Sequence, residues 1–208
     1  MDNVYIIGAS GFGKEVAWLI EENNELNILG FIDDNENVIG TKVNGYNVLG
    51  NIDYLISKVE DINVVIAIGN PNIRELIVNR LKAKSNIFYP NIISKDAIVS
   101  KYVDLGIGNI ICTKSIVTTN IKFGNFNHVN LNCTIGHDVI LEDFITIYPS
   151  VSVSGNVHIN NYTELGTGSR IIQGKTLTSN VIVGAGAVVV KDLLEAGTYV
   201  GVPVKKVK

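Results

Sequence analysis

Histidine is the side chain that enzymes most often use to move protons, because its imidazole changes charge near neutral pH. This chain of 208 residues has three of them, His128, His137 and His158. His137 follows Gly136 and precedes Asp138, and an imidazole beside a carboxylate is typical of a general base. We therefore predict that His137 is a catalytic base. A histidine without a chemical role is the alternative, and it is the favoured interpretation for His128 and His158.

A glycine-rich turn near the start of the chain indicates a phosphate site. Gly8, Ser10, Gly11, Phe12 and Gly13 lie between a short apolar run and a helical pattern. Backbone N–H groups at such a helix start bind phosphate, and the glycines allow close approach. Two known patterns do not fit, because a glutamate follows the lysine where a P-loop needs Ser or Thr, and G-x-G-x-x-G is absent. We expect a mononucleotide or sugar-nucleotide phosphate here, with a plain tight turn as the alternative.

Acidic residues close the second apolar run. Asp33 and Asp34 follow it directly, at a position where a carboxylate can meet a ribose or a base. A solvated strand end is the alternative for both. Pro71, just after Gly69 and Asn70, stands where a helix can begin.

The elements that position these residues read as alternating strands and helices, which predicts a small parallel sheet with right-handed crossovers. A loop containing Gly40 and Gly45 is expected between the second strand and the second helix. The expected strands cover 4–7, 26–32, 63–68 and 87–88, and the expected helices cover 14–22, 52–59 and 72–84.

The second half of the chain has an apolar residue at every sixth position. The series runs without a miss from Ile93 to Val189. A period of six matches neither a helix nor a plain strand, but it suits a coil with three flat sides and eighteen residues per turn. The repeated residues should point inward and stack from coil to coil.

A second series lies four residues after the first and consists mainly of small or β-branched residues, as inner corners require. Asn109, Asn127 and Lys175 interrupt it. Glycine often follows the repeated apolar residue, and we expect those glycines to permit tight turns; they are Gly106, Gly124, Gly136, Gly166 and Gly184.

The coil also bears on metal binding. Ligands on one face should recur at multiples of eighteen, whereas the histidines are nine and twenty-one residues apart. His128 and His137 therefore lie half a coil apart and cannot meet within one subunit. A zinc site of the carbonic-anhydrase-like kind would have to be shared between subunits, so we expect no metal.

Composition sets broad limits. Apolar residues make up 46% of the chain and charged residues 18%, so it can bury a core. The net charge of −3 argues against nucleic acid as a main partner. The start of the chain does not resemble a signal peptide, and no apolar run approaches the ~18 residues of a membrane span. Cys112 and Cys133 are expected as buried free thiols, and a cytoplasmic location is expected.

The whole chain resembles the bacterial sugar acetyltransferases of the NeuD/PglD type. The resemblance rests on the six-residue period and on five motifs in order, which are Gly8–Gly13, Asp33–Asp34, Ala67–Asn70, Gly136–Asp138 and Val200–Lys206. It implies a Rossmann-like sugar-nucleotide-binding domain over 1–88 and a left-handed parallel β-helix of hexapeptide repeats over 89–208. It also implies a homotrimer with active sites between subunits.

The activity that the resemblance implies uses acetyl-CoA. Such enzymes acetylate the amino group of a nucleotide-linked 4-amino-6-deoxy sugar or, in the sialic-acid branch, a hydroxyl group. The first activity is expected here, because a nucleotide needs the N-terminal pocket. O-acetylation of sialic acid or a related sugar is the alternative, and a non-catalytic trimeric sugar-nucleotide-binding protein is a further one. Direct attack without an acyl-enzyme is expected, since no Ser or Cys adjoins His137.

The resemblance also assigns residues by position. The base is His137 and its acidic neighbour is Asp138, while Asn130 lies close to the sugar. The nucleotide half meets the Gly8–Gly13 turn (Gly8, Ser10, Gly11, Phe12 and Gly13), Asp33, Asp34, Gly69 and Asn70. The cofactor arm meets Gly155, Thr167 and Ala185, and it also meets Thr146. Thr146 and Phe12 stand where many relatives have histidine.

Overall fold

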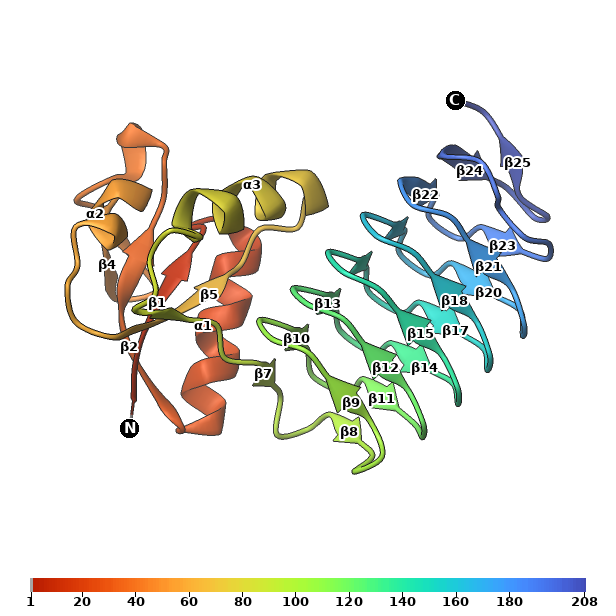
Figure 1. Ribbon diagram of the computed structural model, residues 1–208, viewed down its shortest axis with the longest axis horizontal. Helices are drawn as coiled ribbons and strands as arrows, with labels where there is room; N and C mark the ends of the chain where they lie inside the picture. The colour runs from red at the N-terminus through yellow and green to blue at the C-terminus, as the bar shows by residue number, and fades with distance from the viewer. Residues whose placement is uncertain (1) are drawn as a thin grey trace. The chain divides into compact units, whose positions relative to one another are not determined.

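The computed structural model describes residues 2–208, and the chain divides into two compact units, residues 1–94 and 95–208 (Figure 1). The first unit is a six-stranded sheet in the order β3-β4-β2-β1-β5-β6. All neighbours are parallel except β3 and β4. Its strands are β1 (Asp2–Ile7), β2 (Leu26–Ile32), β3 (Lys42–Val43), β4 (Tyr46–Gly50), β5 (Ile62–Ile66) and β6 (Ile87–Phe88).

The helices of this unit lie close to their predicted places. They are α1 (Gly11–Asn23), α2 (Ile52–Ile56) and α3 (Pro71–Leu81), with one 3-10 turn at Glu36–Val38. α1 packs against β1 and β2 through Val16, Ala17 and Ile20, which are buried at helical spacing. α2 and α3 both end earlier than the sequence predicts, and α1 begins earlier, directly at the glycine turn.

The β3–β4 hairpin corrects the expected loop. Its turn is Asn44-Gly45, and both residues have left-handed backbone, with φ of 48° and 88°. An Asn-Gly pair favours such a two-residue turn, because both of its central positions need positive φ. The hairpin adds two strands to the sheet edge beyond β2, and β4 supplies the carbonyl of Gly50 that accepts from the backbone N–H of Asp33 at 2.9 Å.

The second unit is a parallel β-helix with three flat sheets (Figure 1). Its strands repeat every eighteen residues in register, so that Ile111, Val129 and Ile147 stack on successive coils. One short strand, β7 (Ile92–Ile93), precedes the unit. The first sheet holds β10 (Ile110–Ile111), β13 (His128–Val129), β16 (Thr146–Ile147), β19 (Glu164–Leu165), β22 (Val181–Val183), β24 (Gly197–Val200) and β25 (Lys205–Lys206). The second holds β8 (Ile98–Val99), β11 (Ile116–Val117), β14 (Thr134–Ile135), β17 (Ser152–Val153), β20 (Arg170–Ile171) and β23 (Val188–Val189). The third holds β9 (Asp104–Leu105), β12 (Lys122–Phe123), β15 (Ile140–Leu141), β18 (His158–Ile159) and β21 (Thr176–Leu177).

The six-residue period is confirmed as the core of this unit. Every repeated residue from Ile111 to Val189 is buried, whereas Ile93, Val99 and Leu105 at the start of the series are only half-buried. Burial of an aliphatic side chain contributes roughly 1.5–3 kcal/mol, so this inner column dominates the stability of the unit.

The corners of the coil differ from the sequence-based expectation. Positive φ recurs at every sixth residue from Gly108 to Gly186, three positions after the repeated apolar residue. The glycines directly after the apolar residue have no positive φ, so they do not make the turns. They are needed for close packing instead: a side chain at Gly136 would lie 2.7 Å from the backbone nitrogen of Gly155 in the next coil.

Bulky residues occupy some of these left-handed corners. Phe126, Phe144 and Tyr162 have φ of 54°, 57° and 60° and lie one coil apart from each other. Their rings stack nearly parallel, with centroids 5.3 and 5.8 Å apart. A left-handed conformation costs such residues roughly 1–2 kcal/mol, and ring stacking offsets part of that cost.

Asn109 and Asn127, which seemed to interrupt the inner series, are part of it. Asn109 and Asn127 are buried, and the Asn109 side-chain oxygen accepts from the backbone N–H of Asn127 at 2.9 Å. Asn127 in turn accepts from the Ile145 backbone at 2.7 Å, so the amides form a ladder inside the coil. Cys112 and Cys133 are buried free thiols, as expected.

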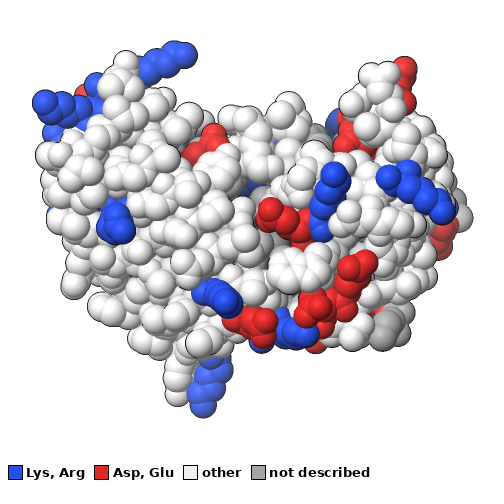
Figure 2. All heavy atoms as spheres, turned by 180° about the vertical axis from the view of Figure 1, so that it is seen from behind, with Lys and Arg blue, Asp and Glu red and all other residues white. Residues whose placement is uncertain are grey.

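The described residues contain no helix long and apolar enough to cross a membrane. On the face shown in Figure 2, charged side chains lie singly or in small groups, and no extended patch of one sign is visible there.

Candidate active site

The glycine turn joins β1 to α1 by close backbone packing. Gly8 has φ of +105°, and its N–H donates to the Ile32 carbonyl at 2.8 Å. A side chain on Gly13 would overlap the Gly8 carbonyl oxygen, so the turn tolerates only glycine there. The Ser10 side chain makes no capping bond to α1, and the first turn of the helix has no acidic residue. Such a helix start favours a bound anion.

Asp33 fixes the shape of this turn. Its two carboxylate oxygens accept from the backbone N–H groups of Ala9, at 2.8 Å, and of Asn35, at 2.9 Å. The carboxylate therefore ties the strand end of β2 to the glycine turn. Asp33 also lines the pocket described below, so its contact with a ribose or a base stays a prediction.

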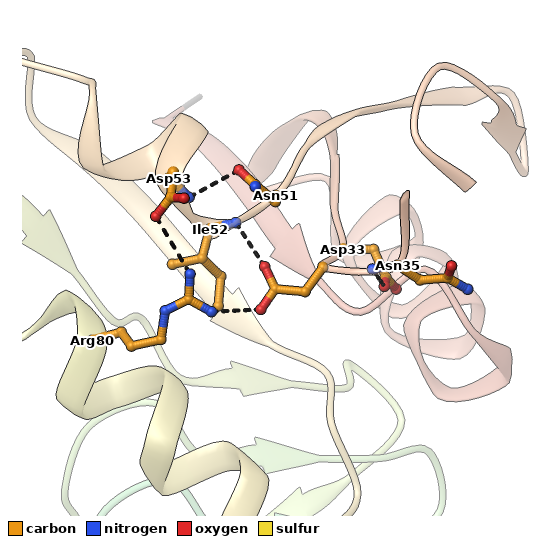
Figure 3. A network of polar contacts seen from close by, with 7 residues as sticks. Asp33, Asn35, Asn51, Ile52, Asp53 and Arg80 are labelled. Carbon is orange, nitrogen blue, oxygen red and sulfur yellow. Dashed lines mark hydrogen bonds and ion pairs between the residues drawn. The ribbon is translucent and has the colours of Figure 1, made fainter. Parts of the chain in front are cut away.

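Arg80 lies in a polar network with Ile52 and Asp53 (Figure 3), and Asp34 pairs with it in a contact that the sequence did not indicate. One oxygen of Asp34 accepts from the Ile52 N–H at 3.1 Å, and the other pairs with the Arg80 guanidinium at 2.5 Å. The same guanidinium lies 3.4 Å from Asp53. Asp34 and Arg80 are 46 residues apart, and no motif links them.

A pocket of about 400 Å³ opens beside this network. Its polar lining comes from Gly8, Asp33, Asp34 and Arg80, and the rest is aliphatic. Two of the aliphatic side chains, Ile73 and Leu76 of α3, are 49% and 62% exposed. An apolar wall with a few convergent polar groups is the usual form of a small-molecule site.

Gly69 and Asn70, which follow β5, support the pocket without lining it. The Asn70 side chain caps α3 by accepting from the Ile73 N–H at 3.1 Å. The fully buried Arg74 donates to the carbonyls of Ile68, at 2.6 Å, and Gly69, at 3.1 Å. The predicted substrate residues Gly69 and Asn70 thus shape the turn that carries Ile68 into the pocket.

His137 lies at a corner of the β-helix, between the second and third sheets. Asp138 has the left-handed backbone of that corner, with φ of 59°, which brings the two neighbouring side chains together. The imidazole Nδ1 is 2.8 Å from the Asp138 carboxylate, and each side chain is 54% exposed. This contact can hold one tautomer of the ring, with the proton on Nδ1 and the lone pair on Nε2.

The other histidines have different surroundings. His158 is paired with Glu142 of the preceding coil, at 2.8 Å. His128 is 1% exposed, which leaves it no access to a substrate in this chain. Among residues 2–208 no group of three potential ligands from His, Cys, Asp and Glu forms a metal site.

Comparisons with known proteins connect the two units to one family. The family model of the PglD N-terminal domain matches residues 3–81. The acetyltransferase domain of PglB from Neisseria gonorrhoeae, solved with acetyl coenzyme A, is 33% identical, with a TM-score of 0.92 over 99% of this chain and 98% of that one. The chain belongs to the NeuD/PglD-type family of sugar acetyltransferases.

Two further relatives have an assigned sugar. The GDP-perosamine N-acetyltransferase of Escherichia coli O157:H7 is 28% identical over 194 residues, which cover 88% of this chain and 84% of the relative. PerB from Caulobacter crescentus, solved with CoA and GDP-perosamine, is 27% identical, with a TM-score of 0.90 over 100% of this chain and 98% of that one. The expected fold class, a Rossmann-like parallel sheet followed by a left-handed parallel β-helix, is confirmed.

Apart from Thr146, the remaining residues predicted from the NeuD/PglD-type resemblance lie on two edges of the β-helix. Gly155 lies at the His137 corner, one coil further on. Thr167 and Ala185 lie one coil apart at the corner between the first and second sheets, and both are exposed. Asn130 begins that same corner two coils earlier and accepts from the Leu131 N–H at 2.8 Å. Thr146 lies in β16 and is 3% exposed.

The buried cysteine of the inner series is not a nucleophile. Burial raises the pKa of the Cys133 thiol to about 11, so it is protonated at neutral pH. A protonated, inaccessible thiol does not form an acyl-enzyme.

Proposed function

We propose that this protein is an acetyl-CoA-dependent N-acetyltransferase that acts on the amino group of a nucleotide-linked 4-amino-6-deoxy sugar. The observation that carries the proposal is the pairing of His137 with Asp138 on a β-helix whose chain also holds a nucleotide-sized pocket. The similarity to relatives named as GDP-perosamine N-acetyltransferases supports an amino-sugar substrate. The nucleotide half of the substrate would occupy the pocket beside Asp34, with its phosphates at the start of α1.

The reaction follows from the His137 geometry. With Nδ1–H donating a hydrogen bond to Asp138, Nε2 carries the lone pair that accepts a proton from the sugar amine. The amine nitrogen forms a bond to the thioester carbonyl carbon, and the C–S bond then breaks. The leaving CoA thiolate takes up the proton held on Nε2, which restores the neutral imidazole.

The deciding experiment is a thiol-release assay with acetyl-CoA and a panel of nucleotide-linked amino sugars. CoA should appear only with a sugar that carries a free amine, and the product should contain an amide. Acetylation of a hydroxyl on a sugar without a nucleotide would favour the O-acetyltransferase instead. Tight sugar-nucleotide binding with no CoA release would point to a non-catalytic binding protein.

The placement of the predicted residues favours a site shared between subunits. Within one β-helix, Thr167 and Ala185 lie at a different corner from His137, so one copy does not gather them. In a trimer, an edge of one β-helix lies beside a different edge of its neighbour. The exposed Ile107 fits a subunit contact.

We therefore predict a homotrimer in solution. Light scattering should give about three times the 22.6 kDa chain mass at working concentration. A monomer with full activity would contradict both the assembly and the shared site. Mixing two inactive variants, His137→Ala and one that blocks the other corner, Ala185→Trp, should restore part of the activity through mixed trimers.

The pocket assignment predicts a selective effect of Asp34. Its carboxylate faces the pocket and can accept from a base or ribose, and a hydrogen bond to a charged group contributes about 1.5–3 kcal/mol. Asp34→Asn should raise KM for the sugar nucleotide by roughly tenfold or more, with kcat and the KM for acetyl-CoA almost unchanged.

Asp53→Asn is the matched control for that measurement. Asp53 contacts the same guanidinium but is 70% exposed and does not line the pocket. Its replacement should leave the KM for the sugar nucleotide within a factor of two or so, because exposed ion pairs contribute little. Equal effects of both replacements would mean that the pocket is not the nucleotide site.

A further inference from the structure

Gly155 lies directly beside the imidazole of His137. The two residues are one coil apart, and the N–H of Asn156 donates to the His137 carbonyl at 2.8 Å, which fixes the register of the two corners. Gly155 is buried although it lies at an outer corner, while the His137 side chain is 54% exposed. The ring therefore covers the glycine.

The contact involves the reactive edge of the ring. A Cβ atom on Gly155 would lie 2.5 Å from both Cε1 and Nε2 of His137 and 2.9 Å from Cδ2. Cε1 and Nε2 are the two ring atoms farthest from the backbone. Real Cβ atoms do not approach other atoms so closely, so any side chain at 155 would displace this edge.

The three atoms nearest to a Cβ at position 155 all belong to the imidazole of His137. Gly155 is absent from the residues with positive φ, so its backbone suits alanine. Gly136, the residue before His137, differs, because the three atoms nearest to a Cβ there are backbone atoms of Ser154 and Gly155 in the next coil. The missing side chain of Gly155 thus leaves room for the imidazole.

We propose that Gly155 is a positioning residue for acetyl transfer: its bare backbone forms a seat that holds Nε2 of His137 where it meets the substrate amine. This inference rests on the proposed function. Asp138 holds the ring at Nδ1 and Gly155 provides space at the opposite edge, so together they set the direction of the lone pair. An alanine would tilt the half-exposed ring toward solvent and move Nε2 away from the amine.

The test is Gly155→Ala, compared with Ser154→Ala at the neighbouring exposed position. Because a misplacement of about 1 Å can cost about 10²-fold in rate, kcat should fall by about that factor. The KM for acetyl-CoA and the Tm should stay unchanged, since the half-exposed ring can move without disturbing the coil. In a His137→Ala background, Gly155→Ala should cause no further loss.

Two kinetic results would overturn this assignment. A raised KM for acetyl-CoA with unchanged kcat would make Gly155 a contact of the cofactor arm. A second, independent loss in the His137→Ala background would mean that Gly155 acts without the imidazole.

A measurement without substrate separates this inference from the proposed function. The ¹⁵N resonances of the His137 ring report the Nδ1 contact with Asp138, and they should shift in Gly155→Ala but not in Ser154→Ala. Unchanged ring resonances would refute the seat even if the enzyme is active. Shifted resonances in a protein with no acetyltransferase activity would retain the seat and reject the proposed reaction.

Discussion

His137→Ala should reduce kcat by ~10²–10⁴-fold, which is the usual contribution of general-base catalysis. The variant loses an imidazole that is 54% exposed and paired with the carboxylate of the next residue, Asp138. Its KM for acetyl-CoA should change little, because an interaction made mainly in the transition state affects kcat. The fold should be unaffected, since residue 137 lies outside the buried inner column. Initial rates of CoA release at saturating substrates would measure the loss.

The chain supplies a matched control for this experiment. His158 also lies 2.8 Å from a carboxylate, that of Glu142, and is 39% exposed. His158→Ala should keep kcat within a factor of a few. A near-native kcat in His137→Ala would exclude it as the base.

The β-helix could be predicted from the sequence because its core residues are chemically alike. Each coil places an aliphatic side chain at the same inward position, so the eighteen-residue register appears directly as a six-residue period. The corners could not be located in the same way. Their left-handed position accepts glycine, asparagine, aspartate, lysine and even phenylalanine, because stacking on the next coil compensates the backbone cost.

In the first unit, the sequence predicts elements with a local pattern but not contacts between distant residues. The strands and α1 follow local apolar patterns, and the Asn44-Gly45 pair is a hairpin signal that sequence reasoning overlooked. The pairing of Asp34 with Arg80 has no local signal, because it depends on where α3 ends relative to β2. The contact between His137 and Gly155 could be predicted from the sequence only in part. Its register follows from the period, but the overlap of the ring with residue 155 needs atomic positions.

The second large effect is expected on stability, when a residue of the asparagine ladder inside the coil is replaced. Asn127 lies inside the coil, where its side-chain NH₂ donates to the Glu142 carbonyl at 2.7 Å and its oxygen accepts from the Ile145 N–H. Asn127→Ala would leave both backbone groups without these partners. Each buried polar group left unpaired costs about 1–3 kcal/mol, so the free energy of unfolding should fall by about 2–6 kcal/mol. Urea denaturation at a fixed protein concentration would measure the change.

Ser169 provides the opposite case in the same inner series. It is fully buried, and its hydroxyl has no hydrogen-bond partner among residues 2–208. Ser169→Ala removes a polar atom that gains nothing from folding, so the urea midpoint should stay the same or rise slightly. The contrast tests whether bonding or burial explains polar residues inside the coil. If both alanine variants lost stability equally, packing volume would govern the inner series, and the asparagine ladder would have no special role.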